Sequence, residues 1–453
     1  MARALRALVV AALLLGSGAA ALAAASPARL LAGAAAVTVD LPADTPLGGY
    51  GGFPRRAWVP DLLGRLPDTF WFRPSTGVHD PIKVRALVLE AGGVRLLWLA
   101  VDLVGMDPSL VADLRHRLDQ LGLRYAAVIA AASHTHSGPG AYARSSLFGF
   151  LALDRESPRV RGRIYSAMEE AAREAERRKR PATVGTGRSE VTGITDSRVR
   201  EAPDPELGVL KVMGTDNRPV AVMWNYAIHG TALGLRNRKL SGDVMGDASA
   251  RLEEQLGVPA LFVNGAVGDA SPRRRGWDGV AAGGKILAGA VLTLWPRIEA
   301  DPVQRLAAAS VTASLPPPGL ELRNCLGRWI PRGTRLGLGS ALPSSAEVWA
   351  VAMGRGAWVA IPGELDTRLG LDIKTAGRAS FAQAFVAGVS NAYQGYFVTP
   401  EHFRKPSYIS CGSLYGERGG ELVRDAAIAA LRELGERGER EERRAPRPVK
   451  PER

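Results

Sequence analysis

Three histidines and one glutamate each stand just past an apolar run, where a metal site could form: His134, His136, His229 and Glu364. Two imidazoles and a carboxylate, with one position open to water, are the ligand set of hydrolytic zinc sites, in which the metal lowers the pKa of the water to about 7. Alternate side chains of an extended segment face opposite ways, so one histidine of the His134/His136 pair is expected to reach the metal. The other histidine then remains free for acid/base work.

Each of these residues also has a structural interpretation. A single His-x-His pair is as compatible with a structural role as with metal binding, and His229 could be a core histidine with satisfied hydrogen bonds. A buried Glu364 without a cation would be costly, which favours a metal. Ser271 offers a different chemistry, because it lies on a Gly-rich turn after a buried strand, as nucleophiles do, although the Gly-x-Ser-x-Gly pattern is missing. These residues alone leave serine and metal-dependent hydrolysis both open.

Strands that alternate with helices would hold these residues, and they predict an α/β fold with mixed β-sheets flanked by helices in a single large catalytic domain. Gly92-Gly93 joins two alternating runs into a hairpin, and Asp107-Pro108 begins a helix that Gly122 ends. The polar clusters follow strands, which is where α/β folds build their sites. The expected strands span 83–89, 94–101, 125–132, 207–213, 220–228, 261–263, 358–361 and 381–389, and the expected helices span 107–121, 158–180, 280–298 and 366–374.

The two ends of the chain differ in composition from the predicted domain at 26–432. Residues 1–25 have the layout of a secretory signal peptide, with arginines first, then an apolar run, then small residues. The apolar run is shorter than a membrane span of roughly 20 residues, so a secreted or periplasmic mature chain without a transmembrane helix is expected. The charge-dense segment 433–453 is predicted to be a disordered tail.

Two further features bear on the fold. The segment 315–342 is rich in Pro and Gly and is predicted to be a long surface excursion. Only two cysteines occur, Cys325 and Cys411, so a disulfide framework is excluded, while a single bridge remains open.

The formal net charge of +13 would suit a nucleic-acid-binding protein. However, the basic residues are spread along the whole chain beside Asp and Glu, without interleaved aromatic residues, so no nucleic-acid partner is expected. The same charge favours peripheral contact with an anionic membrane surface.

Seven short motifs place Gly, His, Ser, Asp, Glu and Tyr in polar turns along the chain. They are Gly49-Tyr50-Gly51, Ser133-His134-Thr135-His136-Ser137-Gly138-Pro139, Asn225-Tyr226-Ala227-Ile228-His229-Gly230-Thr231, Ser241-Gly242-Asp243, Val267-Gly268-Asp269-Ala270-Ser271-Pro272, Ile361-Pro362-Gly363-Glu364 and Gly388-Val389-Ser390-Asn391-Ala392-Tyr393-Gln394-Gly395-Tyr396. The chain resembles the neutral/alkaline non-lysosomal ceramidase family, which shows the same series in the same order. The resemblance runs from about Gly33 to Gly416.

The resemblance implies one Zn²⁺ per chain, with four residues as its ligands: His134, His229, Glu364 and Tyr396. Tyr408 matches the tyrosine that steadies the oxyanion, and His136 matches the free histidine beside the metal. Arg198 matches an arginine that lines the site. Ser271 matches a serine that members of the family need, either to contact the head-group hydroxyl of the substrate or in a more direct role.

The implied reaction is zinc-dependent hydrolysis of the linear amide of ceramide or a related N-acyl sphingolipid to a fatty acid and a sphingoid base. Water would attack the amide carbonyl, and His136 or a neighbour would protonate the departing amine. The C-terminal β-sandwich domain of the family is expected to be missing, and the segments after Arg198 and over 404–413 depart from the family where substrate contacts are expected.

Two alternatives therefore remain. One is a zinc hydrolase of the same fold that acts on another N-acyl amine or on an ester, because fold and site resemblance do not fix the substrate. The other is a non-catalytic, cationic surface-binding protein. Such a protein would have no electrostatic reason to keep an acid and two imidazoles converging, which argues against it.

Overall fold

The structure is a computed structural model, and it describes residues 30–301 and 305–444. Twelve strands form its two main sheets. They are β1 Leu31–Thr38, β2 Lys83–Ala91, β3 Val94–Val101, β4 Ala127–Ala132, β5 Arg180–Glu190, β7 Glu206–Gly214, β8 Pro219–Tyr226, β9 Ala260–Asn264, β11 Leu306–Ser314, β14 Ser345–Met353, β15 Gly356–Ala360 and β17 Gln383–Ala387. The larger sheet has the order β4-β3-β2-β1-β5-β7-β8-β9, and the smaller has the order β11-β14-β15-β17. Each sheet contains parallel and antiparallel pairs, so both are mixed.

The larger sheet folds back on itself. Strands β1 and β5 pair only at Leu31 with Pro181 and at Ala32 with Arg180. Strands β4 and β9, from opposite ends of the strand order, are in contact. The two halves of this sheet and one face of the smaller sheet therefore enclose a shared apolar core.

Alternation along each strand sorts its side chains between this shared core and an outer one, because successive residues of a strand face opposite sides. In β2, Leu87 and Leu89 face the shared core, whereas Ala86 and Val88 face outward. In β15, Trp358 faces the shared core. The alternation of the strands thus divides their buried side chains between one shared core and three outer cores.

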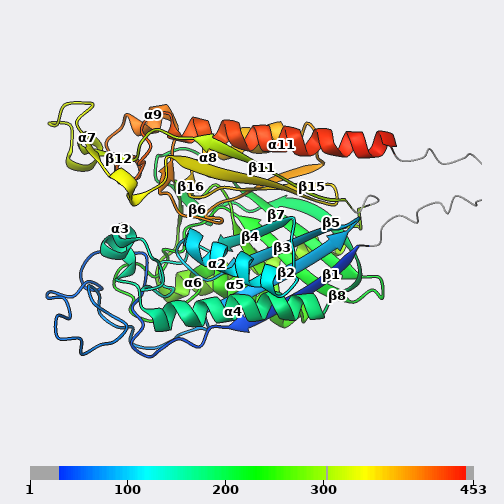
Figure 1. The fold of residues 1–453 in the computed structure, drawn as a ribbon, viewed down its shortest axis with the longest axis horizontal. Coiled ribbons are helices and arrows are strands. Elements are labelled where there is room, and N and C mark those ends of the chain that lie inside the picture. The colour runs from blue at the N-terminus through cyan, green and yellow to red at the C-terminus, as the bar shows by residue number, and fades with distance from the viewer. Residues whose placement is uncertain (1–29, 302–304, 445–453) are drawn as a thin grey trace, which may run out of the picture.

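A pair of helices covers each outer core (Figure 1). The pairs are α2 Pro108–Gln120 with α4 Pro158–Arg177 over β1–β4, α5 Asp243–Leu256 with α6 Gly276–Leu294 over β7–β9, and α8 Thr367–Gly377 with α11 Gly419–Arg444 over the smaller sheet. Local signals start several of them: the side chains of Asp107, Ser157 and Asp366 accept hydrogen bonds from the first turns of α2, α4 and α8. The predicted α/β fold with mixed sheets flanked by helices is confirmed. The described residues contain no separate β-sandwich domain.

Short elements connect the main strands and helices; most of them carry the polar turns at one end of the sheets and the rim above these turns, whereas η2 continues the C-terminal end of α6. They are β6 Thr195–Ser197, β10 Ala270–Pro272, β12 Gly319–Glu321, β13 Arg335–Gly337, β16 Glu364–Leu365, β18 Tyr396–Phe397, α3 Ser146–Phe148, α7 Leu322–Leu326, α9 Pro400–Phe403, α10 Tyr408–Cys411, η1 Gly149–Leu153, η2 Trp295–Arg297 and η3 Gly339–Ala341. The predicted excursion 315–342 contains β12, α7 and β13, so it is partly regular. A disulfide joins Cys325 on α7 to Cys411 on α10, which resolves the question of the two cysteines.

The structure bears on the predicted C-terminal tail but not on the predicted signal peptide. The proposed signal peptide, residues 1–25, lies outside the described residues. Helix α11 continues to Arg444, and Leu434 is fully buried in the outer core of the smaller sheet. The expected start of a disordered tail at Glu433 is therefore too early, because an apolar residue beyond it still packs on the core. Residues 445–453 lie outside the described residues.

Within the described part of the chain, one helical stretch is long and apolar enough to cross a membrane by length and composition, at Gly276–Arg297. The same criteria fit a helix that covers a protein core. This stretch comprises α6 and η2, and it buries Val280, Leu287 and Val291 against the outer core of β7–β9.

Candidate active site

Three parallel strand pairs deliver their carboxyl ends to one place. Residue 132 at the end of β4 donates its backbone N–H to the carbonyl of Val389, which follows β17, at 3.1 Å. Gly388 in turn donates to Asn264, at the end of β9, at 2.9 Å. Gly265 donates to Tyr226, at the end of β8, at 3.1 Å. The turns after these strands therefore meet, as expected for polar residues that follow strands in an α/β fold.

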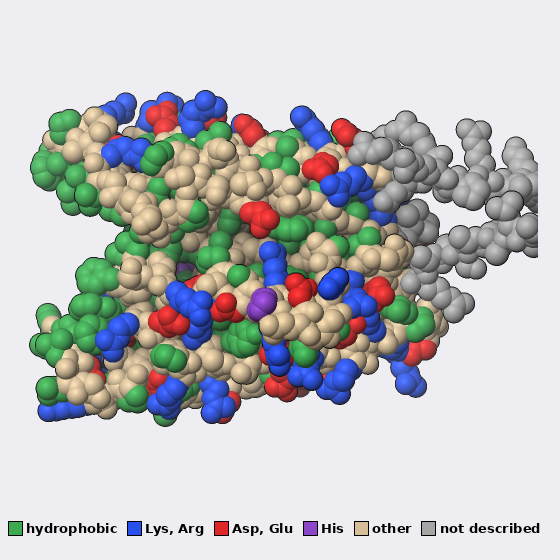
Figure 2. All heavy atoms as spheres, viewed as in Figure 1, with side chains coloured by type: hydrophobic (Ala, Val, Ile, Leu, Met, Phe, Trp, Pro, Cys, Tyr) green, Lys and Arg blue, Asp and Glu red, His purple; other side chains and the backbone are tan. Residues whose placement is uncertain are grey.

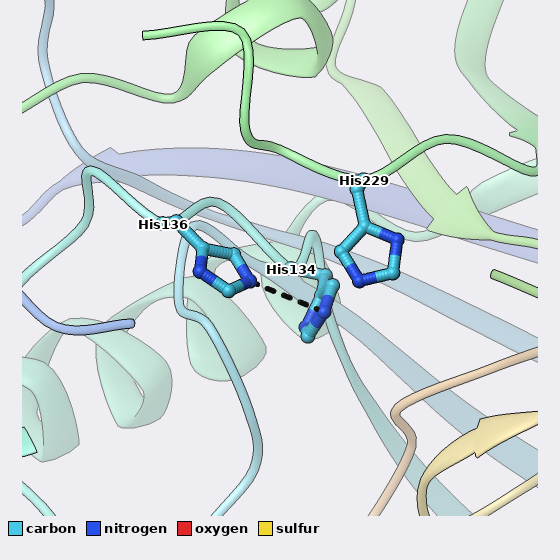
Figure 3. Close-up of side chains that lie close together, drawn as sticks. All are labelled: His134, His136 and His229. Carbon is cyan, nitrogen blue, oxygen red and sulfur yellow. Dashed lines mark hydrogen bonds between the residues drawn. The ribbon is translucent and has the colours of Figure 1, made fainter. Parts of the chain in front are cut away.

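Three histidines come from two of these turns and face one another, as Figure 3 shows. His134 and His136 follow β4, and His229 follows β8. Their ligand nitrogens all lie within 4.8 Å of one another, and Nε2 of His136 is 3.4 Å from Nε2 of His134. His134 has a positive φ of 65°, a strained conformation for a non-glycine residue that is typical of functional sites.

Backbone carbonyls fix the orientation of all three rings. The Nδ1 atom of His134 lies 2.5 Å from the carbonyl of Val104, and that of His229 lies 2.9 Å from the carbonyl of Ala270. The Nδ1 atom of His136 lies 2.9 Å from the carbonyl of Gly49. A carbonyl can only accept, so each Nδ1 donates and each neutral ring keeps its Nε2 lone pair for the centre of the cluster. This is the arrangement by which proteins present histidines to a metal.

The carboxylate of Glu364 contacts two of the three histidines. Its Oε1 lies 3.4 Å from Nε2 of His134, and its Oε2 lies 2.8 Å from Nε2 of His229. All three side chains are buried. The hydroxyl of Tyr393 donates to Oε1 of Glu364 at 2.6 Å, so the carboxylate has one fixed hydrogen bond and a free edge toward the histidines.

The charge distribution in this cluster favours a bound cation. Burial and the neighbouring histidines hold the pKa of His136 well below its usual range, and burial with nearby Arg198 lowers that of His229 to about 3. Burial raises the pKa of Glu364, but His134 and His229 outweigh it and hold it well below its usual value. The lone pair of neutral His229 thus faces an ionised carboxylate, so that two hydrogen-bond acceptors lie against each other.

Two buried atoms confirm this mismatch. Nε2 of His229 and Oε2 of Glu364 have no hydrogen-bond partner among the described residues, although they lie 2.8 Å apart. Unsatisfied buried polar atoms are costly, and a divalent ion that accepts both lone pairs would satisfy them together. Zn²⁺ binds imidazole nitrogens and carboxylate oxygens, so these side chains fit that ion.

Tyr396 and Arg198 lie beside this cluster. In the parallel pairing of β16 with β18, Tyr396 is the direct partner of Glu364. Nη1 of Arg198 donates to the hydroxyl of Tyr396 at 3.2 Å, and its Nε donates to Oγ of Ser271 at 2.6 Å. Burial and the charge of Glu364 raise the pKa of Tyr396 well above its usual value. Arg198 therefore ties two of the predicted site residues together.

A large cavity opens in front of the cluster. It has a volume of about 1230 Å³, above the range of typical small-molecule pockets. Its lining includes the expected site residues Arg198, Ser271, Glu364, Tyr396 and His136, and also the charged side chains of Asp107, Arg115 and Glu347. The remaining wall is largely apolar and includes Val104, Phe148, Leu153, Leu320, Leu342 and Leu414. Such a cavity suits a ligand with one polar end and one long apolar part.

Tyr408 lies at this cavity, on α10. Its ring packs edge-on against that of Tyr396, with 5.9 Å between the ring centroids, and the side chain is 72% exposed. The hydroxyl can therefore reach a ligand in the cavity. All eight residues expected at the site from the sequence lie at or beside this cavity and the histidine cluster.

Three further residues support the site without having been expected there. Tyr393 holds Glu364, and it stands in the motif Gly388–Tyr396 without an assigned role. The buried guanidinium of Arg55 donates to the carbonyl of His136 at 2.5 Å and to that of Gly48 at 3.0 Å. A Cβ on Gly49 would lie 2.8 Å from the ring of His136, and its φ of +99° also requires glycine. No spacing in the sequence indicates these contacts, because Arg55 and Gly49 approach His136 from a distant loop.

Comparisons with known proteins agree with this fold. The family model of the N-terminal part of neutral/alkaline non-lysosomal ceramidase matches residues 72–284. A neutral ceramidase of Oryza sativa subsp. japonica is 26% identical over 215 residues, which are 41% of this chain and 26% of that protein. The neutral ceramidase of Mycobacterium tuberculosis is 27% identical over 205 residues, which are 40% of this chain and 32% of that protein. Each alignment thus covers a minority of the relative's length.

The solved structures extend the similarity to most of the chain. The crystal structure of neutral ceramidase from Pseudomonas aeruginosa matches with a TM-score of 0.78 at 17% identity, over 91% of this chain and 75% of that one. A ceramidase complexed with C2 matches with a TM-score of 0.77 at 17% identity, over 91% of this chain and 76% of that one. The fold and the resemblance expected from the seven motifs are confirmed.

Proposed function

We propose that this chain, which resembles the neutral/alkaline non-lysosomal ceramidases, is a zinc-dependent hydrolase of the amide bond of ceramide or a related N-acyl sphingolipid. The products would be a fatty acid and a sphingoid base. The observation that carries the proposal is the convergence of three histidines, two of which contact the Glu364 carboxylate through Nε2, beside a large, mostly apolar cavity.

In this proposal His134, His229, Glu364 and Tyr396 hold one Zn²⁺. The ion would supply a water whose pKa is lowered to about 7 and would polarise the amide carbonyl. The mismatched, unsatisfied atoms of His229 and Glu364 support these ligands, because they are satisfied once a cation is present.

The remaining residues have roles in proton transfer and charge stabilisation. His136 keeps Nε2 directed at the cluster through its bond to Gly49, so its lone pair accepts a proton from the attacking water and then passes that proton to the departing amine. The hydroxyl of Tyr408 donates to the oxyanion that develops on the amide oxygen. Ser271, fixed by Arg198, contacts the head-group hydroxyl of the lipid.

The apolar cavity wall accounts for the substrate class. Phe148, Leu320 and Leu342 lie on the wall, and the exposed area of the cavity lining is mostly apolar. An N-acyl lipid with its amide at the cluster would bury its hydrocarbon against this wall, at about 25 cal/mol for each Å² removed from water.

Metal analysis and a substrate panel test the proposal. Purified protein is expected to contain about one zinc per chain. His229→Ala should lose both zinc and activity, whereas His116→Ala, at an exposed histidine on α2, should keep both. Full activity in a metal-free, chelator-treated sample would reject the zinc mechanism.

The panel should contain ceramides, N-acyl amino acids and esters of matched chain length. Ceramide is expected to be cleaved with the highest kcat/KM. Cleavage of esters alone would reject the amidase assignment, and a preference for N-acyl amino acids would assign the same chemistry to another lipid amide.

We also propose that the chain is exported, on the signal-peptide pattern of residues 1–25. The disulfide between Cys325 and Cys411 supports an oxidising compartment. The mature protein should begin near Ala24 or Ser26, and recovery of the protein in the cytoplasmic fraction alone, with Met1 retained in N-terminal sequencing, would contradict export.

A further inference from the structure

Two groups of side chains contain most of the large apolar residues that the described part of the chain exposes. The first, which we name the lower lip, comprises Phe53, Trp58, Val59, Leu62, Leu63 and Phe150. The second, the upper lip, comprises Leu326, Trp329 and Leu336 in the excursion 315–342. Exposure reaches 78% at Trp58, 73% at Leu62 and 76% at Trp329. Contiguous exposed apolar groups of this kind mark interaction surfaces.

The two lips flank the cavity mouth. Phe148 and Leu151, the neighbours of Phe150, line the cavity from the lower side. Leu320 and Cys325, in the same excursion as Trp329, line it from the upper side. Figure 2 shows apolar side chains on both sides of a notch at one end of the molecule, where Figure 1 places α3 and the loop below it on one side and α7 with β12 on the other.

Specific contacts hold the lower lip in place. Arg56 lies over the rings of Phe72 and Phe150, at 4.7 Å and 4.8 Å from the ring centroids, and it donates to the carbonyl of Phe150. Trp71 packs edge-on against Phe150, with 5.3 Å between centroids. Phe53 and Trp58 also pack against each other, with 4.8 Å between centroids, so the lip is a built surface whose apolar side chains nevertheless stay exposed.

The upper lip is basic as well as apolar. Arg323, Arg328, Arg332, Arg404 and Lys405 line a second pocket of about 410 Å³ together with Glu401. Lys405 pairs with Glu401 at 2.7 Å, and Arg404 pairs with Glu417 at 2.6 Å. Arg328 and Arg332 are exposed and have no ion-pair partner among the described residues, so they are available to an anion.

We propose that the two lips dock the chain on the surface of an anionic phospholipid bilayer. Trp58, Leu62, Leu63 and Trp329 would insert at the level of the head groups, where tryptophan is favoured, while the basic side chains contact lipid phosphates. Exposed apolar tips beside unpaired arginines match the two components of such a surface, hydrocarbon and negative charge. Because the cavity opens between the lips, an N-acyl lipid could pass from the bilayer to Glu364 without crossing water.

Docking does not depend on the proposed function; only the delivery of substrate to Glu364 rests on it. The primary test is therefore binding, by sedimentation with phosphatidylcholine vesicles that contain or lack phosphatidylserine. Wild-type protein should bind the anionic vesicles more tightly, and added salt should weaken this binding.

Three variants test the two components separately. Leu62→Ser/Leu63→Ser and Trp329→Ser should each reduce the vesicle partition coefficient by roughly tenfold or more, because each removes apolar area that the bilayer would bury. Arg328→Glu/Arg332→Glu should abolish the preference for phosphatidylserine. The matched control is Leu121→Ser/Leu371→Ser, which changes two exposed leucines outside the lips and should bind as wild type.

Activity separates the two proposals. The lip variants should hydrolyse a short-chain, water-soluble ceramide as wild type does, but should be slower on long-chain ceramide in vesicles. Wild-type protein that does not bind vesicles, or lip variants that bind as tightly as wild type, would overturn the docking proposal. Lip-dependent binding by a protein without activity on either substrate would leave docking in place and reject the proposed function.

Discussion

The hydroxyl of Tyr393 donates to Oε1 of Glu364 at 2.6 Å, and the same oxygen lies 3.4 Å from Nε2 of His134. The two rings of Tyr393 and His134 also stack, with 6.3 Å between centroids. One tyrosine thus fixes the carboxylate and one wall of the histidine cluster. Because that hydroxyl is the hydrogen-bond donor to Oε1, it determines which edge of Glu364 remains for a metal.

Tyr393→Phe should therefore weaken metal binding while leaving the fold intact. Partners behind a metal ligand typically contribute roughly 10- to 100-fold in affinity, so a loss of this size is expected in a zinc-competition titration. Tyr415→Phe is the control, because it removes a hydroxyl that donates to the carbonyl of Pro343 at 2.9 Å and not to a proposed ligand. Unchanged zinc affinity in Tyr393→Phe would show that Glu364 is held by other contacts.

Arg198 and Ser271 should act as one unit. Nε of Arg198 donates to Oγ of Ser271 at 2.6 Å, so removing either partner disturbs the other. We expect Arg198→Met and Ser271→Ala each to lower kcat/KM on ceramide, and the double variant to lose little more than the worse single one, with a coupling of about 1–3 kcal/mol. Fully additive losses in a double-mutant cycle would show that the two residues work separately.

Lys374 stabilises two buried carboxylates away from the site. Its Nζ lies 2.6 Å from Oδ2 of Asp204 and 3.0 Å from Oε1 of Glu206, and all three side chains are buried. Lys374→Met should lower the free energy of unfolding by about 3–5 kcal/mol in urea titrations, because it leaves the buried Asp204 without a cationic partner among the described residues, while Glu206 keeps Arg188 and Arg378. Arg424→Met, which breaks partly exposed pairs with Asp372 and Asp425, should cost about 1 kcal/mol or less.

The same variant has a defined pH dependence. Burial raises the pKa of Glu206, but Lys374 and Arg378 outweigh it, so the folded-state pKa lies below the ordinary value of 4.5. Glu206 therefore contributes full stability above about pH 4.5 and loses it as the pH falls through the folded-state pKa. The difference between wild type and Lys374→Met should be largest near neutral pH and should shrink in acid. A difference that is constant with pH would contradict this ion-pair account.

The sequence predicts best where local signals are strong. Gly92 and Gly93 both adopt positive φ between β2 and β3, as a two-residue hairpin requires, and Asp107 caps α2 as expected. By contrast, β1 and β11 are rich in alanine, whose side chain marks neither face of a strand, so alternation does not identify them. Helix α5 follows a polar motif directly and contains Gly246, which weakens its helical pattern.

The site divides in the same way. His134, His229 and Glu364 follow apolar strands, so their types and places suffice to nominate them. The contacts that orient them are mostly backbone carbonyls, such as that of Val104 for His134, and any residue type could supply these. Only the folded chain therefore reveals which ring nitrogen is free.

The bridge between Cys325 and Cys411 joins the excursion that bears Trp329 to the helix that bears Tyr408. A reducing agent would cut this link without touching the histidine cluster, which lies on other segments. Reduction should therefore loosen the mouth of the cavity and leave the histidine cluster at its floor unchanged. Protein made among cellular reductants would keep its histidine cluster assembled yet have a less constrained entrance, whereas the same chain matured among oxidants would have both.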